Sequence, residues 1–414
     1  MLTTVLVAGF VLLRRAWATQ SLSGFVVAGR GSADPAGVPN DIPVVPGSGY
    51  DGQFVYRLAL RPWTTVQTAF GIRLDDPAYR QQRIVTPLAA WLLARLPGVS
   101  TAVALVLVNA LALVVASWFG ARIAVALGRS RWWGLVVALP AGIPISLGRD
   151  LTEPVAWAAM LAGLWYAQSR RWPAAAVALT VAVLARETAL LVVVGLGAAY
   201  LLGQGRDVAQ QRRREGGGLP GLAALPARTW RTSARRSAAW RSGGWLQASP
   251  GWLAVPVTAA AGWQLVLWRV WGELPIRSGG SNNLGGSPVA GVARAVVRGM
   301  AGYQGSVWAD TSVRSLWALE RVALVVLFGY AAVAVVRGSS GVGLGVRIAW
   351  ALAALLAVSL RDWSDDAQFL RPLIEAIGLS LLVTLGVRGR VASIVLAGAA
   401  VLTCCVAIEY TQVL

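Results

Sequence analysis

Residues 100–126 read STAVALVLVNALALVVASWFGARIAVA, and this run decides the fold class. Its only charged side chain is Arg122. About 20 apolar residues in a helix cross the hydrocarbon core of a bilayer, so a run of this length predicts a membrane-spanning helix. The rest of the chain is similar, because 56% of its 414 residues are hydrophobic and the mean hydropathy is +0.61. We therefore predict an all-α, polytopic membrane protein.

Apolar runs along the chain predict about eleven membrane-spanning helices, within a range of roughly nine to thirteen. Several runs are only about 15 residues long, which indicates broken or tilted helices around a cavity. We expect the whole chain, 1–414, to form a single transmembrane domain. The predicted spans lie near residues 2–18, 100–126, 134–148, 151–169, 173–185, 187–203, 251–271, 315–336, 345–360, 372–387 and 391–408.

The placement of arginine predicts how the chain is oriented. All 37 basic residues are arginine, against 18 acidic residues, and the net charge is +19. Segment 204–250 holds nine arginines but only Asp207 and Glu215, so the positive-inside rule makes it a basic cytoplasmic loop. Alternation then puts the N terminus in the cytoplasm and makes 20–98 and 272–314 outer loops. Nucleic-acid binding is disfavoured, because the arginines fall between apolar runs.

The acidic residues were not used to derive this topology, and they gather on one side of it. Sixteen of the eighteen, all but Asp207 and Glu215, fall on the outer side or in the outer half of a helix. Because the sequence has no histidine, carboxylates must do any acid or base chemistry. Cys404 and Cys405, adjacent in the last apolar run, are typical of hydrophobic packing. We therefore expect a functional site of carboxylates and arginines on the outer face.

The first outer loop contains GYDGQFVYR, residues 49–57. Asp51 precedes a segment in which Phe54, Val55 and Leu58 recur at helical spacing, which predicts a helix lying on the membrane surface. An aspartate in front of a helix is commonly an N-cap, and the local sequence favours that role over catalysis. The function of Asp51 therefore depends on what surrounds it.

Four further clusters combine acids with arginines at the predicted outer face. Paired arginines suit a phosphate or lipid headgroups, whereas acids at helix starts are ordinary capping partners. The cluster at 148–154 stays open between structure and function. A helix break is predicted at Arg186 and Glu187, because one continuous helix would bury both in the bilayer centre. The clusters are DDPAYRQQR (75–83), GRDLTEP (148–154), LARETALL (184–191) and RDWSDDAQFLRP (361–372). A second interfacial helix is predicted over 84–96, directly after the first of these clusters.

Taken in order, these motifs resemble the bacterial integral-membrane glycosyltransferases of the GT-C superfamily. The resemblance rests on GYDGQFVYRLALRP, DDPAYRQQRIVTPLAAWLL, RDLTEPVAWA and LARETALL, and covers roughly residues 45–195 with a weaker echo at 369–371. It implies a GT-C-like fold with interfacial helices in the first outer loop. It also implies a hexosyl- or pentosyltransferase of the cell envelope that moves a sugar, with inversion, from a polyprenyl-phosphate donor to an acceptor outside the plasma membrane.

The resemblance implies roles for single residues as well. Asp51 would be the catalytic general base. The donor phosphate would be held by Arg80, Arg83, Arg186 or Arg371. Binding of the sugar or acceptor, or orientation of Asp51, would fall to Gln53, Tyr56, Asp150, Glu153 and Glu187. No cofactor or metal ligand is implied, and the use of a divalent ion stays open. The expected partners are membrane lipid, the lipid-linked sugar and an unknown glycan, lipid or protein acceptor, with no nucleic acid.

Two other classes of function remain open. A transporter or flippase for an anionic lipid or solute also needs charge in a membrane cavity, but near the midplane of the bilayer. A structural or partner-binding membrane subunit would use the charged clusters only as loop caps. The glycosyltransferase hypothesis requires Asp51 to lie close to at least one of the arginines assigned to the phosphate.

Overall fold

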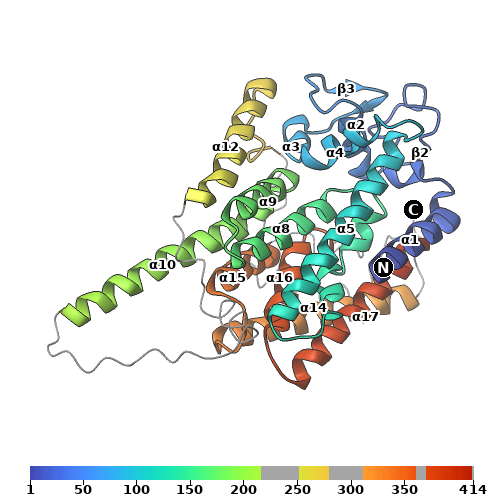
Figure 1. The fold of residues 1–414 in the computed structure, drawn as a ribbon. Helices are drawn as coiled ribbons and strands as arrows, with labels where there is room; N and C mark the ends of the chain where they lie inside the picture. The colour runs from blue at the N-terminus through green and yellow to red at the C-terminus, as the bar shows by residue number, and fades with distance from the viewer. Residues whose placement is uncertain (216–250, 279–310, 360–369, 413–414) are drawn as a thin grey trace.

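The computed structural model describes residues 1–215, 251–278, 311–359 and 370–412. These residues are mostly helical, with the first long loop, residues 20–98, gathered at one end of the helices (Figure 1). The helices are α1 (Leu2–Arg14), α2 (Gly52–Leu60), α3 (Pro77–Gln81), α4 (Val85–Leu93), α5 (Thr101–Ala126), α6 (Trp133–Ala138), α7 (Ile143–Leu147), α8 (Glu153–Gln168), α9 (Trp172–Ala185), α10 (Leu190–Glu215), α12 (Gly251–Trp271), α14 (Thr311–Val336), α15 (Leu344–Ser359), α16 (Ile374–Leu385) and α17 (Arg390–Gln412).

The first loop also carries two small pairs of strands. Strands β1 (Ala28–Gly29) and β2 (Val44–Val45) pair in parallel, and β3 (Thr68–Ala69) and β4 (Ile72–Arg73) pair antiparallel. These pairs lie beside α2 at the loop end of the molecule (Figure 1).

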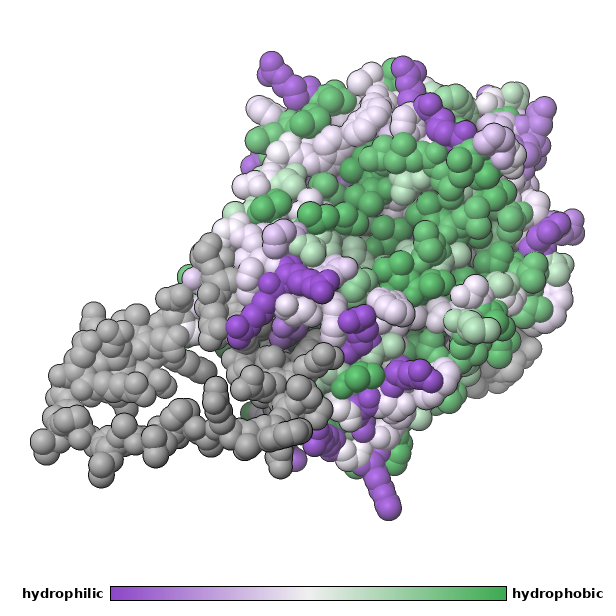
Figure 2. Space-filling model, viewed as in Figure 1, coloured by the Kyte–Doolittle hydropathy of each residue, from purple (hydrophilic) through white to green (hydrophobic). Residues whose placement is uncertain are grey.

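The helices have the length and composition of a membrane protein. In the described part of the chain, five segments are long and apolar enough to cross a bilayer, and four further apolar helices have 10–17 residues. The predicted count of eleven spans is therefore not confirmed, although the apolar helical architecture is. Figure 2 shows hydrophobic side chains gathered over a broad area of the visible face. The five long segments are Leu2–Thr19, Thr101–Ala126, Gly251–Trp271, Leu319–Val336 and Arg390–Thr411.

Two predicted segments differ from the expectation in their secondary structure. The expected span 134–148 consists of two short helices, α6 and α7, because the chain leaves helical geometry at Leu139 and Pro140 cannot continue the backbone ladder. Helix α10 runs on to Glu215, so the first part of the predicted loop 204–250 is helical, and its remainder lies outside the described residues. By contrast, the predicted break is confirmed, since Arg186 is extended at φ −159° and ψ 126°.

The helical spacing of Phe54, Val55 and Leu58 does not leave α2 with one free apolar face. Every residue from Gly52 to Ala59 is buried, including the polar residues Gln53 and Arg57. Phe54 and Leu58 pack in a second hydrophobic core with Ile72 and with Leu105 at the start of α5. The helix is therefore enclosed by its own loop and by the end of a long apolar helix, which fixes Asp51 in front of it.

One glycine allows α2 to approach the GRDLTEP segment. A Cβ atom added at Gly52 would lie 2.2 Å from the carbonyl oxygen of Arg149 and 2.9 Å from that of Val26. Both neighbours are backbone atoms, which cannot swing aside as a side chain can. The close approach brings the start of α2 against the start of α8, where Glu153 is located.

We predict that Gly52→Ala destabilises the protein by about 1–3 kcal/mol or more, because the methyl group overpacks this backbone contact. The unfolding midpoint of the purified protein in detergent measures the effect. Gly197→Ala in α10 is the matched control, since an added Cβ there meets nothing within 4 Å. An equal loss of stability in the two variants would contradict the account of Gly52.

Candidate functional site

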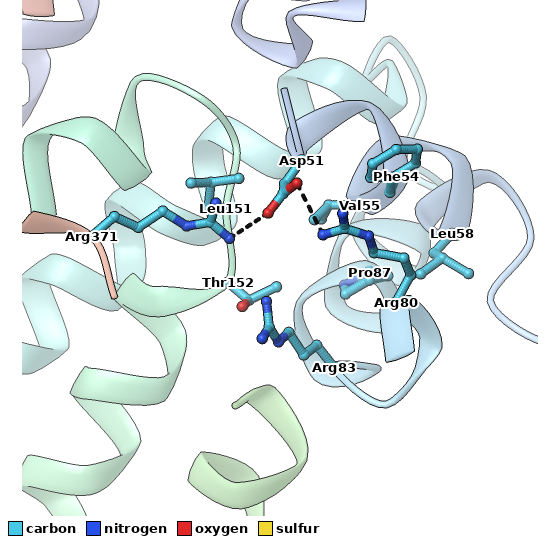
Figure 3. Close-up of a pocket in the computed structure, with 10 residues that line it drawn as sticks. All are labelled: Asp51, Phe54, Val55, Leu58, Arg80, Arg83, Pro87, Leu151, Thr152 and Arg371. Atoms are coloured by element: carbon cyan, nitrogen blue, oxygen red, sulfur yellow. Dashed lines mark ion pairs between the residues drawn. The ribbon is translucent and has the colours of Figure 1, made fainter. Parts of the chain in front are cut away.

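Asp51 lies between two arginines from distant parts of the chain. Its Oδ1 atom is 2.9 Å from Nη1 of Arg80, and its Oδ2 atom is 2.6 Å from Nη2 of Arg371 (Figure 3). Although Asp51 occupies the N-cap position of α2, its side chain makes no capping hydrogen bond. The carboxylate that local sequence favoured as a cap is thus the centre of an ion-pair cluster.

Helix α3 presents Arg80 to this carboxylate. Asp76 caps α3 by accepting a hydrogen bond from the Tyr79 backbone N–H at 3.1 Å, as an aspartate before a helical proline is well suited to do. Asp75 accepts two hydrogen bonds from Arg80, at 2.8 and 2.7 Å, and the guanidinium lies 4.4 Å from the centre of the Phe54 ring. Asp76 therefore caps the helix, and Asp75 orients the Arg80 guanidinium.

Arg371 extends the cluster toward the membrane helices. Its Nε donates to Glu153 Oε1 at 2.8 Å, at the start of α8. The same Glu153 oxygen is 2.6 Å from Arg186, and Arg186 in turn lies 2.9 Å from Glu375. Acids and arginines thus alternate from the first loop to α16, so each guanidinium in this row has a carboxylate partner.

Arg83 forms a second branch beside the same pocket. It makes two hydrogen bonds to Glu187, at 3.0 and 2.6 Å, and a third to the Tyr79 hydroxyl at 2.7 Å. Figure 3 shows Arg83 near Thr152, on the side of the pocket away from the two ion pairs of Asp51. A third arginine thus faces the pocket without contacting Asp51.

The pocket at Asp51 is small. Its volume is about 20 Å³, and its lining combines Asp51 and the three arginines with apolar side chains and Thr152. A cavity of this size holds about one water molecule, so it cannot take a sugar ring. With Asp51 paired to both arginines, the pocket therefore has room for little more than one water molecule.

The arginines control the protonation of Asp51. Burial raises its pKa, but Arg371 and Arg80 outweigh burial and hold the pKa of Asp51 well below its usual range. Burial lowers the pKa of Arg371, but Asp51 and Glu153 outweigh it and raise that pKa well above its usual value. Asp51 is therefore ionised in this arrangement and is a weak base.

Other predicted site residues lie elsewhere. Gln53 is 1% exposed; its amide accepts from the Gly29 N–H at 3.1 Å and donates to the Ser48 carbonyl at 2.9 Å. Tyr56 is buried in the second core. Neither residue lines the pocket, and both hold the first loop around α2.

Asp150 is enclosed next to this cluster. It is fully buried at a backbone φ of 51°, and neither carboxylate oxygen has a hydrogen-bond partner among the described residues. Burial raises its pKa well above the usual range, against a smaller opposing effect of Arg14. Arg14 also donates from Nε to the Gly148 carbonyl at 2.7 Å, which joins α1 to this turn. Asp150 does not line the pocket.

Two residues of the cluster were not predicted. The Tyr50 ring lies between two guanidiniums, with Arg149 at 4.0 Å and Arg371 at 5.3 Å from its centre. Glu375 pairs with Arg186 and also accepts a hydrogen bond from Thr188 at 2.7 Å. The sequence held a signal for Glu375, because an ionisable residue within an apolar span is commonly functional or paired.

Helix α12 contacts the end of α3, between Arg80 and Arg83. Trp271 donates to the Gln81 side chain at 2.7 Å, Trp263 to the Gln81 carbonyl at 3.3 Å, and Gln264 to Gln82 at 3.0 Å. Gln81 and Gln82 separate Arg80 from Arg83 in sequence, so these contacts help to fix where both guanidiniums point.

In the described part of the chain, no group of three His, Cys, Asp or Glu side chains is arranged to hold a metal ion. The acids of the site instead face arginines, as the seven ion pairs show.

Comparisons with known proteins give little guidance. No protein-family model and no curated protein matches the sequence. Among solved structures, an oligosaccharyltransferase from Archaeoglobus fulgidus, in its apo form, is similar at a TM-score of 0.42 and 13% identity. That alignment covers 98% of this chain and 56% of the other, so this chain spans little more than half of that protein's length. A likeness this distant assigns no fold, and the proposal below stands on the geometry of the site.

We predict that Glu153→Gln destabilises the protein by about 1.5–3 kcal/mol, because it removes the fully buried carboxylate that Arg186 and Arg371 share. Arg186 then keeps only Glu375 as a partner, and Arg371 keeps only Asp51. The matched control is Asp75→Asn, another acid-to-amide change in the same row. The Asp75 side chain is 47% exposed, so its loss costs only about 0–1 kcal/mol. Unfolding in detergent measures both values, and similar values for the two variants would contradict the buried role of Glu153.

Proposed function

We propose that the protein is an inverting membrane glycosyltransferase that uses a polyprenyl-phosphate sugar, with Asp51 as general base. The observation that carries the proposal is the position of Asp51, 2.9 Å from Arg80 and 2.6 Å from Arg371. A base and phosphate-binding cations must both lie near the attacked anomeric carbon in such a transfer. The resemblance to GT-C enzymes, drawn from the motifs, points to the same chemistry.

In the proposed reaction, an acceptor hydroxyl attacks the anomeric carbon of the donor sugar. The new bond joins the acceptor oxygen to that carbon, and the bond from the carbon to the phosphate oxygen breaks. Asp51 takes the acceptor proton, and polyprenyl phosphate leaves with one more negative charge than it had as a diester. Arginine suits this leaving group, because its planar cation hydrogen-bonds phosphate oxygens and stays charged throughout.

The donor phosphate would compete with Asp51 for the arginines. The row and its branch contain five carboxylates and four guanidiniums, so their charge is nearly balanced without a substrate. An anion therefore binds best by replacing a carboxylate as an arginine partner. If the phosphate takes Arg80 and Arg371 from Asp51, the closed pocket opens and the pKa of Asp51 rises toward that of an effective base.

Arg83 and Arg186 have different roles in this proposal. Arg83 faces the pocket and joins Arg80 and Arg371 as a phosphate ligand. Arg186 contacts Glu153 and Glu375 instead, so we assign it to positioning Glu153. Oε2 of Glu153 makes no hydrogen bond among the described residues, and we assign it to a sugar or acceptor hydroxyl that reaches it only when the pocket opens.

The proposed setting follows from the arginine topology of the sequence. The protein would be a multi-pass protein of the plasma membrane with its N terminus in the cytoplasm. The site, at the loop end of the helices, would then face outward, where a glycan, lipid or protein acceptor is glycosylated. A transporter or flippase is less well supported, because the paired acids Asp51, Glu153 and Glu375 lie at the starts of helices α2, α8 and α16 and not in the middle of a long helix.

We predict that Asp51→Asn lowers sugar transfer by about 10²–10⁴-fold, because the amide cannot accept the acceptor proton. The assay follows the release of polyprenyl phosphate from a panel of polyprenyl-phosphate sugars by the purified protein. Asp41→Asn is the control, since Asp41 is an exposed acid of the same loop. Undiminished transfer by Asp51→Asn would remove Asp51 as the base.

We further predict that kcat falls on the acid side at a higher pH than kcat/KM for the donor. An aspartate base is lost as pH drops through its pKa, and in the free protein Arg371 and Arg80 hold that pKa low. The ratio kcat/KM reports the free enzyme, whereas kcat reports the complex in which phosphate has taken the arginines. If kcat and kcat/KM fall at the same pH on the acid side, the donor leaves the ion pairs of Asp51 intact.

A further inference from the structure

A larger cavity lies at the opposite end of the helices. Its volume is about 440 Å³, and it is lined by the loop 338–341, by Arg347 of α15, by residues 386–388 and by Leu127 after α5. The start of α5 packs with α2 in the second core, whereas Leu127 follows its other end. A helix of 26 residues is about 39 Å long, so the two cavities are separated by roughly the thickness of a bilayer.

The loops around this cavity are fixed to each other. Gly341 donates its N–H to the Gly386 carbonyl at 2.8 Å, and the Ser340 hydroxyl donates to the Val383 carbonyl at 2.7 Å. A Cβ atom added at Gly386 would lie 2.5 Å from the Ser340 hydroxyl oxygen. Gly338 ends α14 at a φ of 62°, a conformation that glycine adopts without strain. The cavity is therefore bounded by a defined turn.

Two arginines of the cavity form no ion pair with an acid of the described residues, unlike those of the Asp51 site. Arg347 donates only to carbonyl groups, those of Ser340 at 2.5 Å and Val342 at 3.1 Å. Arg388 is exposed, and its guanidinium lies close enough to Gly128 that an added Cβ there would be 2.9 Å from Nη2. Within the described residues, no carboxylate forms an ion pair with either arginine.

A structural explanation of these charges competes with binding. Helices α5, α14 and α16 all end here, and the carbonyl end of each is equivalent to about half a negative charge. Arg347 balances this partial negative charge, since its hydrogen bonds go to loop carbonyls. Arg388 makes no hydrogen bond to a described group, so its cation is available to a ligand in a cavity much larger than one water molecule.

We infer that this cavity binds the phosphate of an anionic headgroup, held by Arg388 with Arg347 beside it. Phosphate is the anion that arginine binds best, and basic pockets between membrane helices on the cytoplasmic side are suited to anionic phospholipids. The predicted topology places this end in the cytoplasm, where Arg129, Arg337 and Arg390 add positive charge. The inference is independent of the chemistry at Asp51.

The test measures the unfolding midpoint of the full chain in detergent as lipid is added. Dioleoyl phosphatidylglycerol is compared with dioleoyl phosphatidylcholine, and glycerol 3-phosphate with inorganic phosphate, for the wild type, Arg388→Gln and Arg390→Gln. Arg390 is the matched control, because it is an exposed arginine two residues away that does not line the cavity. We expect phosphatidylglycerol to raise the wild-type midpoint more than phosphatidylcholine, and Arg388→Gln alone to weaken that response about tenfold.

The other outcomes separate the explanations. A response to glycerol 3-phosphate that also depends on Arg388 would keep the phosphate site but identify a soluble ester as its ligand. Equal weakening by both variants would mean diffuse attraction of lipid to a basic face and would overturn the inference. No response to any phosphate would overturn it as well and leave both arginines as partners of helix ends. The lipid-free midpoint of Arg388→Gln should match the wild type, since the side chain holds no described group.

Discussion

The site depends on one carboxylate shared by two cations. Asp51 cannot hold Arg80 and Arg371 together unless the first loop, α3 and the start of α16 converge on one point, and this structure meets that condition. Charges that leave water are costly unless they are paired with good geometry. The alternation of acids and arginines from Asp75 to Glu375 provides that pairing, and it links the loop to the membrane helices. The same pairing closes the pocket and weakens Asp51 as a base.

A donor phosphate would resolve this conflict between stability and reactivity. In this structure the arginines have carboxylate partners, and the pocket has room for only about one water molecule. A phosphate would supply the arginines with another anion and release Asp51 for proton transfer. Base activity would then depend on the presence of the donor, which reduces the chance that an acceptor hydroxyl is deprotonated without a sugar to attack.

Sequence reasoning located most of the cluster but not its pairings. The apolar runs and the arginine pattern predicted a helical architecture with acids at one end, and Asp51 does lie beside arginines that were named in advance. Periodicity could not show that α2 is buried on every side, because the strands and α5 that cover it come from elsewhere in the chain. The resemblance implied binding or orienting roles beside Asp51 for Gln53 and Tyr56, whereas helical geometry turns both side chains into the loop core. Glu375 was missed because its partner Arg186 is distant in sequence.

The most direct test measures the pKa of Asp51 itself, with and without a donor. Infrared difference spectroscopy of the carboxylate stretch, assigned by the loss of the band in Asp51→Asn, would follow its titration in the purified protein. The account predicts a pKa well below that of an ordinary aspartate in the free protein. It also predicts a rise when a non-transferable polyprenyl-phosphate sugar analogue binds. A pKa that is already ordinary in the free protein, or one that the bound analogue leaves unchanged, would contradict it.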